Sequence, residues 1–434
     1  NAPLPVCSLA FSSDNLLAMV FYKLGNHQKA FEFVAQESDL YNHLVIASFI
    51  QLGQVIEDGL VDFAKNTSNH NYAILLHYGQ HAIELEHHRL VEVYEKALEN
   101  SANDELRLFT AKHYINHLLD VGAYDQAVLR AEYFMKLAIS EEAIFAMKEH
   151  LSAALMSKLE MPFEKEKLDE IEQLQLSVIT FYEERKLKVK AGLILIDASE
   201  VANYKQDYPS SKDNIMKAIL YFREENMPEF LGEATVRKAT LLYTWSKNGS
   251  PQYYKPSINA YQDALKVFKR DTHPERFADI QHNLGLIYSE IPVGPDEQAI
   301  WSAFCASAFK EALSIYDKTH YPYQFATVAH NYATALINFP EAKIHNNLNK
   351  ANGLFNEALE IRTSAYPFER ASTLLNQLEL YWLLNNENEQ QELEKLEQMF
   401  SKVNEVKQLT TDEALNNRAD DMLIKLQELK PMLK

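Results

Sequence analysis

The sequence predicts an all-α protein built as a solenoid of antiparallel helix pairs, and three observations support this fold class. Glycine and proline are scarce in the 434 residues, at 11 and 14 copies, where average usage would give roughly 30 and 22. Tight turns and glycine-rich ligand loops must therefore be few. Hydrophobic residues still make up 47% of the chain, which is typical of a folded protein and too apolar for a disordered one. The third observation is an internal repeat.

Four prolines mark this repeat, at positions 228, 274, 322 and 367, so successive units are 46, 48 and 45 residues long. Each proline follows an alanine by nine or ten residues, and these alanines are Ala218, Ala264, Ala312 and Ala358. A small residue stands four positions after each proline: Gly232, Ala278, Ala326 and Ala371. Proline fits the first position of a helix, so each unit should begin a helix there, with the small residue where a neighbouring helix approaches closely. The next helix should end at the alanine and the Leu or Ile that follows it.

These units resemble the tetratricopeptide repeat, in particular a long-period bacterial form of it. The resemblance rests on residues 264–268, 274–278 and 283–285 of one unit and 312–316, 322–326 and 331–333 of the next. It is strong over about 210–385 and weaker upstream. The ordinary period of the family is about 34 residues, so the surplus here should lie in longer helices and in loops such as 291–297. The resemblance implies a right-handed α-solenoid in which one helix of each pair lines a concave groove.

Glycine-containing turns predict further helix pairs upstream, in a domain of degenerate repeats over residues 1–165. Gly25 and Gly122 are each followed five residues later by an alanine, Ala30 and Ala127, and Gly53 marks a third, degenerate copy. A glycine in the left-handed conformation can end the first helix of such a pair. The alanine then lets the second helix pack closely against the first.

Three further regions complete the predicted domain organisation. Charged connecting helices are expected over 166–209, because 163–174 carries apolar residues at helical spacing and reads as a long exposed helix. Long-period repeats should occupy 210–390. Capping helices should occupy 391–434, since a solenoid needs a last helix with a polar outer face. Turn-forming residues predict linkers at 205–211 and 246–251.

The charge balance narrows the class of partner. The formal net charge is −19, from 61 acidic and 42 basic residues, which would repel phosphate backbones and anionic lipids. Nucleic acid and membrane surfaces are therefore not expected as partners, whereas basic or neutral proteins and peptides are. The chain contains no stretch of 18 or more apolar residues, and its first residues do not form a signal peptide. Its two cysteines lie far apart, which favours a reducing, cytoplasmic location.

Catalytic motifs are missing from the sequence, so an enzyme is not expected, and neither is a cofactor. Phosphate-binding loops, dinucleotide fingerprints and nucleophile elbows all need glycine patterns that do not occur here. One alternative is a metal site, in which His77, His81 and Glu84 would share a helical face. Cys7 and Cys305 have no nucleophile context. We interpret Cys305 as a small core residue.

The candidate binding residues are those that the family resemblance places in the groove. Nine positions after the repeat prolines stand Arg237, Asn283, Asn331 and Asn376, which match the groove-facing asparagine of peptide-binding tetratricopeptide repeats. Near them lie Glu233, Asp279, His282 and His330. An asparagine amide both donates and accepts, so a ladder of them could hold a peptide backbone. The alternative is that these asparagines bond to a neighbouring helix. The histidines could make binding depend on pH.

The predicted function is a non-catalytic protein-interaction scaffold that binds a peptide or a partner domain in its groove. The lysines that accompany such asparagines in the carboxylate-clamp form of the family do not occur at the corresponding positions, so capture of a C-terminal carboxylate is not expected. The alternative is a sensor module of a larger signalling or defence protein, whose effector domain, such as a caspase-like peptidase, lies outside this chain. The sequence leaves the oligomeric state open.

Overall fold

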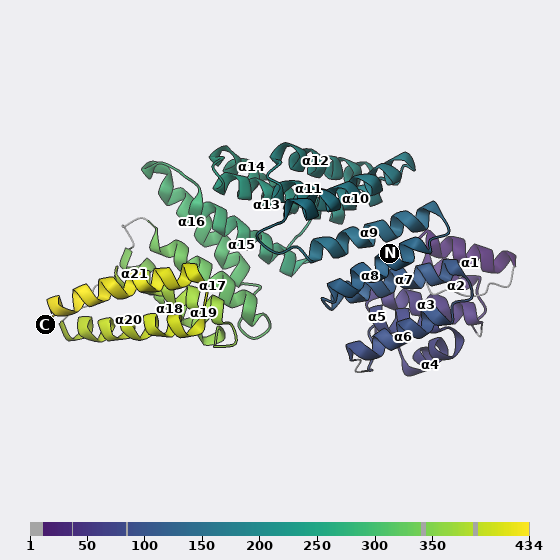
Figure 1. Ribbon diagram of the computed structural model, residues 1–434, viewed down its shortest axis with the longest axis horizontal. Coiled ribbons are helices and arrows are strands. Elements are labelled where there is room, and N and C mark those ends of the chain that lie inside the picture. Colours follow the sequence, from purple (N-terminus) through teal and green to yellow (C-terminus); the bar gives the residue numbers. More distant parts are fainter. Residues whose placement is uncertain (1–11, 37, 84–85, 340–343, 385–388, 434) are drawn as a thin grey trace. The chain divides into compact units, whose positions relative to one another are not determined.

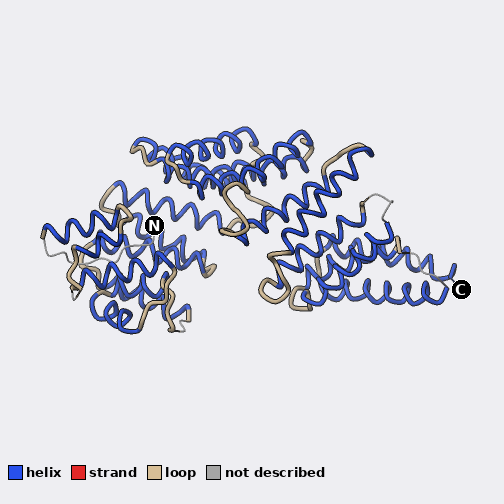
Figure 2. Tube along the Cα trace, turned by 180° about the vertical axis from the view of Figure 1, so that it is seen from behind, coloured by secondary structure: helices blue, strands red, loops and turns tan. Residues whose placement is uncertain are grey.

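A computed structural model describes residues 12–36, 38–83, 86–339, 344–384 and 389–433 (Figure 1). Within these ranges the chain forms α-helices joined by short connections and no β-strand (Figure 2). The predicted all-α class and its antiparallel helix pairs are therefore confirmed. The chain divides into two compact units, Asn1–Asp207 (unit 1) and Tyr208–Lys434 (unit 2). The predicted bounds at 165, 209 and 390 stay predictions.

Unit 1 consists of eleven described helices that pack mainly on their neighbours in sequence. They are α1 (Ser13–Lys23), α2 (His27–Glu32), α3 (Asp39–Leu52), α4 (Asp58–Thr67), α5 (Asn69–Tyr78), α6 (His87–Glu99), α7 (Asp104–Asp120), α8 (Tyr124–Lys136), α9 (Glu141–Ser157), α10 (Lys165–Glu184) and α11 (Lys188–Tyr204). The predicted charged helix is α10, but it is not exposed all round, because Leu168, Ile171 and Val178 are buried.

The glycine turns predicted in unit 1 are confirmed by the backbone. Gly25, Gly53 and Gly122 have φ values of 76°, 63° and 74° and follow α1, α3 and α7. The later turns use the same left-handed conformation without glycine, at Lys186 (φ 58°) and Gln206 (φ 61°). Gln206 lies within the linker predicted at 205–211. That linker is wrong in extent, since α11 runs to Tyr204 and the next helix begins at Tyr208.

Unit 2 contains the long-period repeats and the capping helices. Its helices are α12 (Tyr208–Glu224), α13 (Pro228–Lys247), α14 (Tyr254–Ala264), α15 (Pro274–Glu290), α16 (Pro295–Leu313), α17 (Pro322–Ile337), α18 (Ile344–Ile361), α19 (Pro367–Tyr381), α20 (Glu389–Leu409) and α21 (Glu413–Leu429). A 3₁₀ turn covers Pro251–Tyr253. The four repeat prolines each occupy the first residue of a helix, which confirms the prediction.

The small residues of the repeat lie where helices approach closely, also as predicted. Ala278, Ala326 and Ala371 are fully buried. A Cβ atom added to Gly232 would lie 2.7 Å from the ring of Phe268. At Gly232 an aromatic ring thus packs directly against the small residue of the repeat.

One helix of each pair forms an inner row in unit 2. Helix α15 packs on α17, α17 on α19 and α19 on α21, whereas α16, α18 and α20 pack mainly on their neighbours in sequence. Helix α13 joins this row through the contact of Glu233 with Arg276 on α15. We call the surface formed by α13, α15, α17, α19 and α21 the inner face of unit 2. Unit 1 has a similar row in α3, α5, α7 and α9.

The C-terminal helices α20 and α21 lie side by side, drawn in yellow in Figure 1. They close a core that α19 begins, with Leu378, Met399 and Leu426 among its buried residues. Across the described parts of the chain, no helix is both long enough and apolar enough to cross a bilayer.

Candidate interaction surface on the inner face of unit 2

The predicted groove residues all lie on helices of the inner face. Glu233 and Arg237 are on α13, Asp279, His282 and Asn283 on α15, His330 and Asn331 on α17, and Asn376 on α19. They share these helices because each follows its repeat proline by five, eight or nine residues, and each proline begins its helix at the same point. The spacing from the repeat prolines thus determines which residues of each helix lie on this face.

Two of the asparagines connect successive inner helices. The Nδ2 atom of Asn331 lies 2.7 Å from Nε2 of His282, and Nδ2 of Asn376 lies 3.3 Å from Nε2 of His330. An amide nitrogen only donates, so each histidine accepts at Nε2 and carries its proton on Nδ1. His330 Nδ1 lies 3.1 Å from the Thr373 hydroxyl oxygen. We call these His–Asn contacts rungs. For Asn331 and Asn376 the structure thus fits the alternative that they bond to a neighbouring helix.

Asn283 is different because its rung is missing. The position that holds a histidine in the two later units is Val236 on α13, and an isopropyl group cannot accept a hydrogen bond. The Asn283 side chain is half-buried on the inner face. Within the ranges that the structure describes, its amide has no hydrogen-bond partner. Both its donor and its acceptor therefore remain available.

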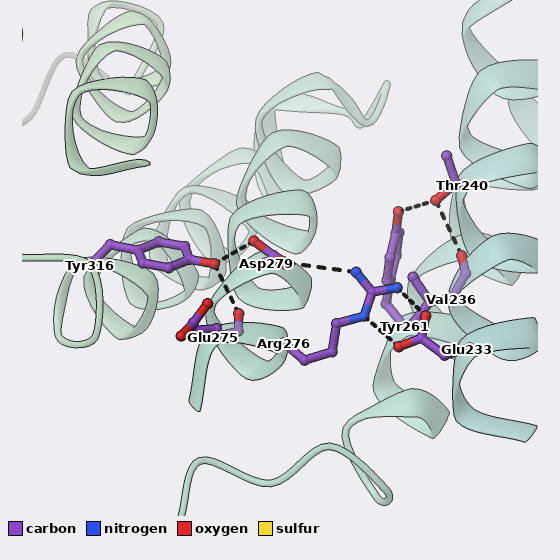
Figure 3. Close-up of polar contacts among 8 residues, drawn as sticks. All are labelled: Glu233, Val236, Thr240, Tyr261, Glu275, Arg276, Asp279 and Tyr316. Atoms are coloured by element: carbon purple, nitrogen blue, oxygen red, sulfur yellow. Dashed lines mark hydrogen bonds and ion pairs between the residues drawn. The ribbon is translucent and has the colours of Figure 1, made fainter. Parts of the chain in front are cut away.

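The two acidic groove residues are already paired. Arg276 donates from Nε to Glu233, at 2.9 Å, and forms a second bond through Nη2. Figure 3 shows the same guanidinium directed also at Asp279, at 3.6 Å, and the Tyr316 hydroxyl donating to Asp279. Burial and the neighbouring Asp279 carboxylate raise the pKa of Tyr316. A paired carboxylate attracts a ligand cation less than a free one, so these acids give weaker support for a basic partner than the sequence suggested.

The next unit replaces this acid–tyrosine contact by a buried arginine. Tyr316 and Arg362 both stand four residues after their repeat alanine, and Arg362 donates from Nη2 to the Thr327 hydroxyl, at 3.1 Å, where Asp279 stands one unit earlier. Arg362 is 5% exposed and forms no ion pair with the described residues. Its Nε has no acceptor. Sequence reasoning missed it, although aligning position four after the alanine would have shown Phe268, Tyr316 and Arg362.

The histidines of the rungs are uncharged at neutral pH. Burial lowers the pKa of His282 to about 4 and, aided by the Arg362 and Arg418 charges, that of His330 to about 3. The pH-dependent binding that their positions suggested is therefore not expected between pH 6 and 8. Their role in this structure is to accept the asparagine hydrogen bond.

A cavity of about 610 Å³ opens between α19 and α21 at the end of the inner face. Its lining residues are Leu375, Glu379, Trp382, Arg418, Asp421, Met422, Lys425, Glu428 and Leu429. Arg418 donates to the Asn376 side-chain oxygen, at 3.0 Å, and to Glu379, at 2.5 Å. Asn376, the last asparagine of the series Asn283, Asn331 and Asn376, is thus hydrogen-bonded to a residue that lines this cavity.

The alternative metal face of unit 1 is not formed. Helix α5 ends at Tyr78, so His81 lies beyond the helix that carries His77, and Glu84 is outside the described residues. Both ring nitrogens of His77 are engaged, Nδ1 by the Tyr94 hydroxyl and Nε2 by Asp120. In the described ranges no group of three His, Cys, Asp or Glu residues could hold a metal ion.

Cys305, the cysteine that the structure describes, gives no sign of a reactive site. Cys305 is fully buried on α16, as predicted for a core residue, and its thiol donates to the Gly285 carbonyl. Burial raises its pKa to about 12. Cys7 lies outside the described residues.

The rung geometry predicts unequal effects of asparagine substitutions on stability. Asn331→Ala should lower the free energy of unfolding by about 1–2 kcal/mol, because it leaves the His282 acceptor unpaired. Asn283→Ala breaks no rung and should change it by less than about 0.5 kcal/mol. All three tryptophans, Trp245, Trp301 and Trp382, lie in unit 2, so urea unfolding followed by tryptophan fluorescence measures this unit. Equal losses for the two variants would contradict the assignment.

Comparisons with known proteins do not identify a family. No protein-family model and no curated protein matches the chain. Among solved structures, yeast Tom70 is 14% identical, with 97% of each chain covered and a TM-score of 0.25. A circular tandem repeat protein is 11% identical over 97% of this chain and 95% of its own, with a TM-score of 0.26. TM-scores this low do not establish a shared arrangement, so the fold assignment rests on the helices and contacts described above.

Proposed function

We propose that this chain is a non-catalytic protein-interaction solenoid that binds an extended segment of a partner protein along the inner face of unit 2. The observation that carries the proposal is that Asn283, Asn331 and Asn376 stand at equivalent positions of successive repeats but differ in their hydrogen bonds. Asn331 and Asn376 join successive helices, whereas Asn283 occupies the same register without a partner among the described residues. A half-buried amide that keeps its donor and acceptor can pair with one peptide group of a ligand.

Three further features agree with this function. The repeat frame extends the inner face over four units, which suits an extended ligand. The sequence lacks catalytic motifs, and the buried Cys305 thiol has a raised pKa, so it is a poor nucleophile. The two cysteines favour a reducing compartment such as the cytoplasm.

A peptide-display selection against the full chain tests the proposal. Selected peptides should bind at least tenfold more weakly to Asn283→Ala than to the native chain, which corresponds to about 1.4 kcal/mol for the lost amide contacts. Asn404 is a matched control, since it is exposed on the outer helix α20. Asn404→Ala should bind as the native chain does. If the selected peptides bind both variants with the affinity of the native chain, binding at this face is contradicted.

A further inference from the structure

The cavity between α19 and α21 has an apolar floor. Leu375 and Met422 are 1% and 8% exposed and come from facing helices, and Leu429 continues the floor on α21. Trp382, directly after α19, is 38% exposed. Its indole N–H donates to the Met422 sulfur, at 2.8 Å. The indole is therefore held in place while one part of it remains accessible.

The rim of this cavity carries more negative than positive charge. Glu379 and Arg418 neutralise each other through their ion pair, at 2.5 Å. The other three rim charges are Asp421, Lys425 and Glu428, which stand at i, i+4 and i+7 on α21 and are exposed. None of these three forms an ion pair with a described residue outside the cavity. Two carboxylates against one ammonium leave the rim negative, in a chain whose formal net charge is −19.

We infer that this cavity receives an arginine or lysine side chain of the partner segment, with its aliphatic stem on the Leu375–Met422 floor and its charged head between Trp382 and the Asp421 and Glu428 carboxylates. The inference rests on the proposed function and names the class of ligand for one end of the inner face. It does not require the paired acids Glu233 and Asp279 to attract a cation.

Three physical features favour this occupant over an acidic or purely apolar side chain. Long cationic side chains lay their methylene groups on apolar surface and keep the charge in water. An accessible indole face attracts a guanidinium or ammonium group. The negative rim, together with the field of the whole chain, attracts a cation and repels a carboxylate. The volume of about 610 Å³ also leaves room for residues on either side of the anchor.

Fluorine NMR of the full chain labelled with 5-fluorotryptophan tests the inference. The chain has three tryptophans, and Trp382→Phe identifies the Trp382 signal by its loss. The probes are four heptapeptides, each with one central residue between two leucines and flanking glycines, in which that residue is Arg, Lys, Glu or Leu. The Arg and Lys peptides should shift the Trp382 signal and bind at least tenfold more tightly than the Glu and Leu peptides. An unmoved Trp382 signal, or equal binding of the Leu peptide, would overturn the inference.

Charge reversal gives a second, independent measurement. Asp421→Lys combined with Glu428→Lys should weaken the Arg peptide at least tenfold and strengthen the Glu peptide. Glu397→Lys changes charge on the exposed outer side of α20, away from the cavity, and should leave both affinities within twofold. Unchanged preference in the double variant would overturn the inference. If peptides selected by display depend on Asn283 while the Arg peptide leaves Trp382 unmoved, the proposed function stands and this inference fails.

Discussion

Lowering the pH from 7 to 5 should destabilise unit 1 more strongly than unit 2. Six histidines on the inner row of unit 1 are buried, or half-buried in the case of His77, and have a lowered pKa: His43, His70, His77, His113, His117 and His150. Burial is the largest cause for each. Of the histidines that the structure describes in unit 2, only His282 and His330 have a lowered pKa.

The hydrogen bonds of this cluster explain why the neutral forms are fixed. The Thr110 hydroxyl donates to the Leu106 carbonyl and therefore accepts from His70 Nδ1, at 2.7 Å. His113 Nδ1 pairs with the Tyr78 hydroxyl, at 3.0 Å, and the Nε2 atoms of His70 and His113 are buried without partners. The ring centroids of these two histidines are 6.4 Å apart. Two positive charges at this distance would repel each other in a buried site.

The sign of the pH effect follows from proton uptake. The pKa of His70 and of His117 is about 4, and that of His113 about 3, so the unfolded chain takes up protons first as the pH falls. The stability that these neutral histidines give unit 1 is fully present above about pH 6.5. It is lost as the pH falls towards the pKa values of the folded state. At pH 5 each of these three histidines costs at most about 2 kcal/mol. Several together would use up most of the stability of an ordinary domain.

Hydrogen exchange of the intact chain, measured by mass spectrometry, separates the two units. At pH 5 peptides from α5 and α7 should lose more protection than peptides from α17 and α19, after correction for intrinsic exchange rates, because unit 1 contains six such histidines and unit 2 two. His113→Asn copies unit 2, where Asn376 stands three residues after Thr373 and pairs with His330. This substitution should reduce the loss of unfolding free energy of unit 1 at pH 5 by about 2 kcal/mol. His88→Asn, at an exposed position, is the control and should leave the pH dependence unchanged. Equal loss of protection in both units would refute this account.

Replacement of Gly285 by valine should be among the most damaging single changes in unit 2. A Cβ atom at Gly285 would meet three ring atoms of Phe309 at 2.9 Å. Phe309 is fully buried and stacks on Tyr332, with ring centroids 5.2 Å apart, so it has little room to move. Overpacking of this kind costs about 1–3 kcal/mol, and the β-branched side chain puts the expected loss near the upper end.

A double-mutant cycle makes the glycine prediction specific. Phe309→Ala alone should cost about 3–5 kcal/mol, and Gly285→Val with Phe309→Ala should cost clearly less than the sum, because the new methyl groups partly fill the cavity. Gly294→Ala is the control, since no atom lies within 4 Å of an added Cβ there. Urea unfolding followed by tryptophan fluorescence measures all four. Additive losses would show that the ring contact is not the cause.

The sequence predicted those parts of the fold that depend on local backbone constraints. The repeat prolines each begin a helix, and Gly25, Gly53 and Gly122 each adopt the left-handed turn. The same turn at Lys186 and Gln206 could not be predicted, because tertiary packing offsets a strain of about 1 kcal/mol that gives no sequence signal. The proline frame also fixed which residues share the inner face.

The pairing of those residues could not be predicted, because it depends on contacts between successive repeats whose residues lie far apart in the sequence. Asn331 and His282 are 49 residues apart, and only the angle between their helices brings them together. The repeat spacing alone treats Asn283, Asn331 and Asn376 alike, whereas Val236 leaves Asn283 without the histidine contact that the other two have. The cavity beside Trp382 also escaped prediction, since it requires α21 to pack along α19.

The connections along the inner face also differ in how they respond to salt. The Asn331–His282 and Asn376–His330 rungs join α15 to α17 and α17 to α19 through neutral groups. Between α13 and α15, the corresponding connection is the partly exposed Arg276–Glu233 ion pair. Dissolved ions screen an exposed pair and leave neutral hydrogen bonds almost unaffected. Raising the ionic strength should therefore weaken the connection between α13 and α15, at the repeat that carries Asn283, more than the two connections that follow.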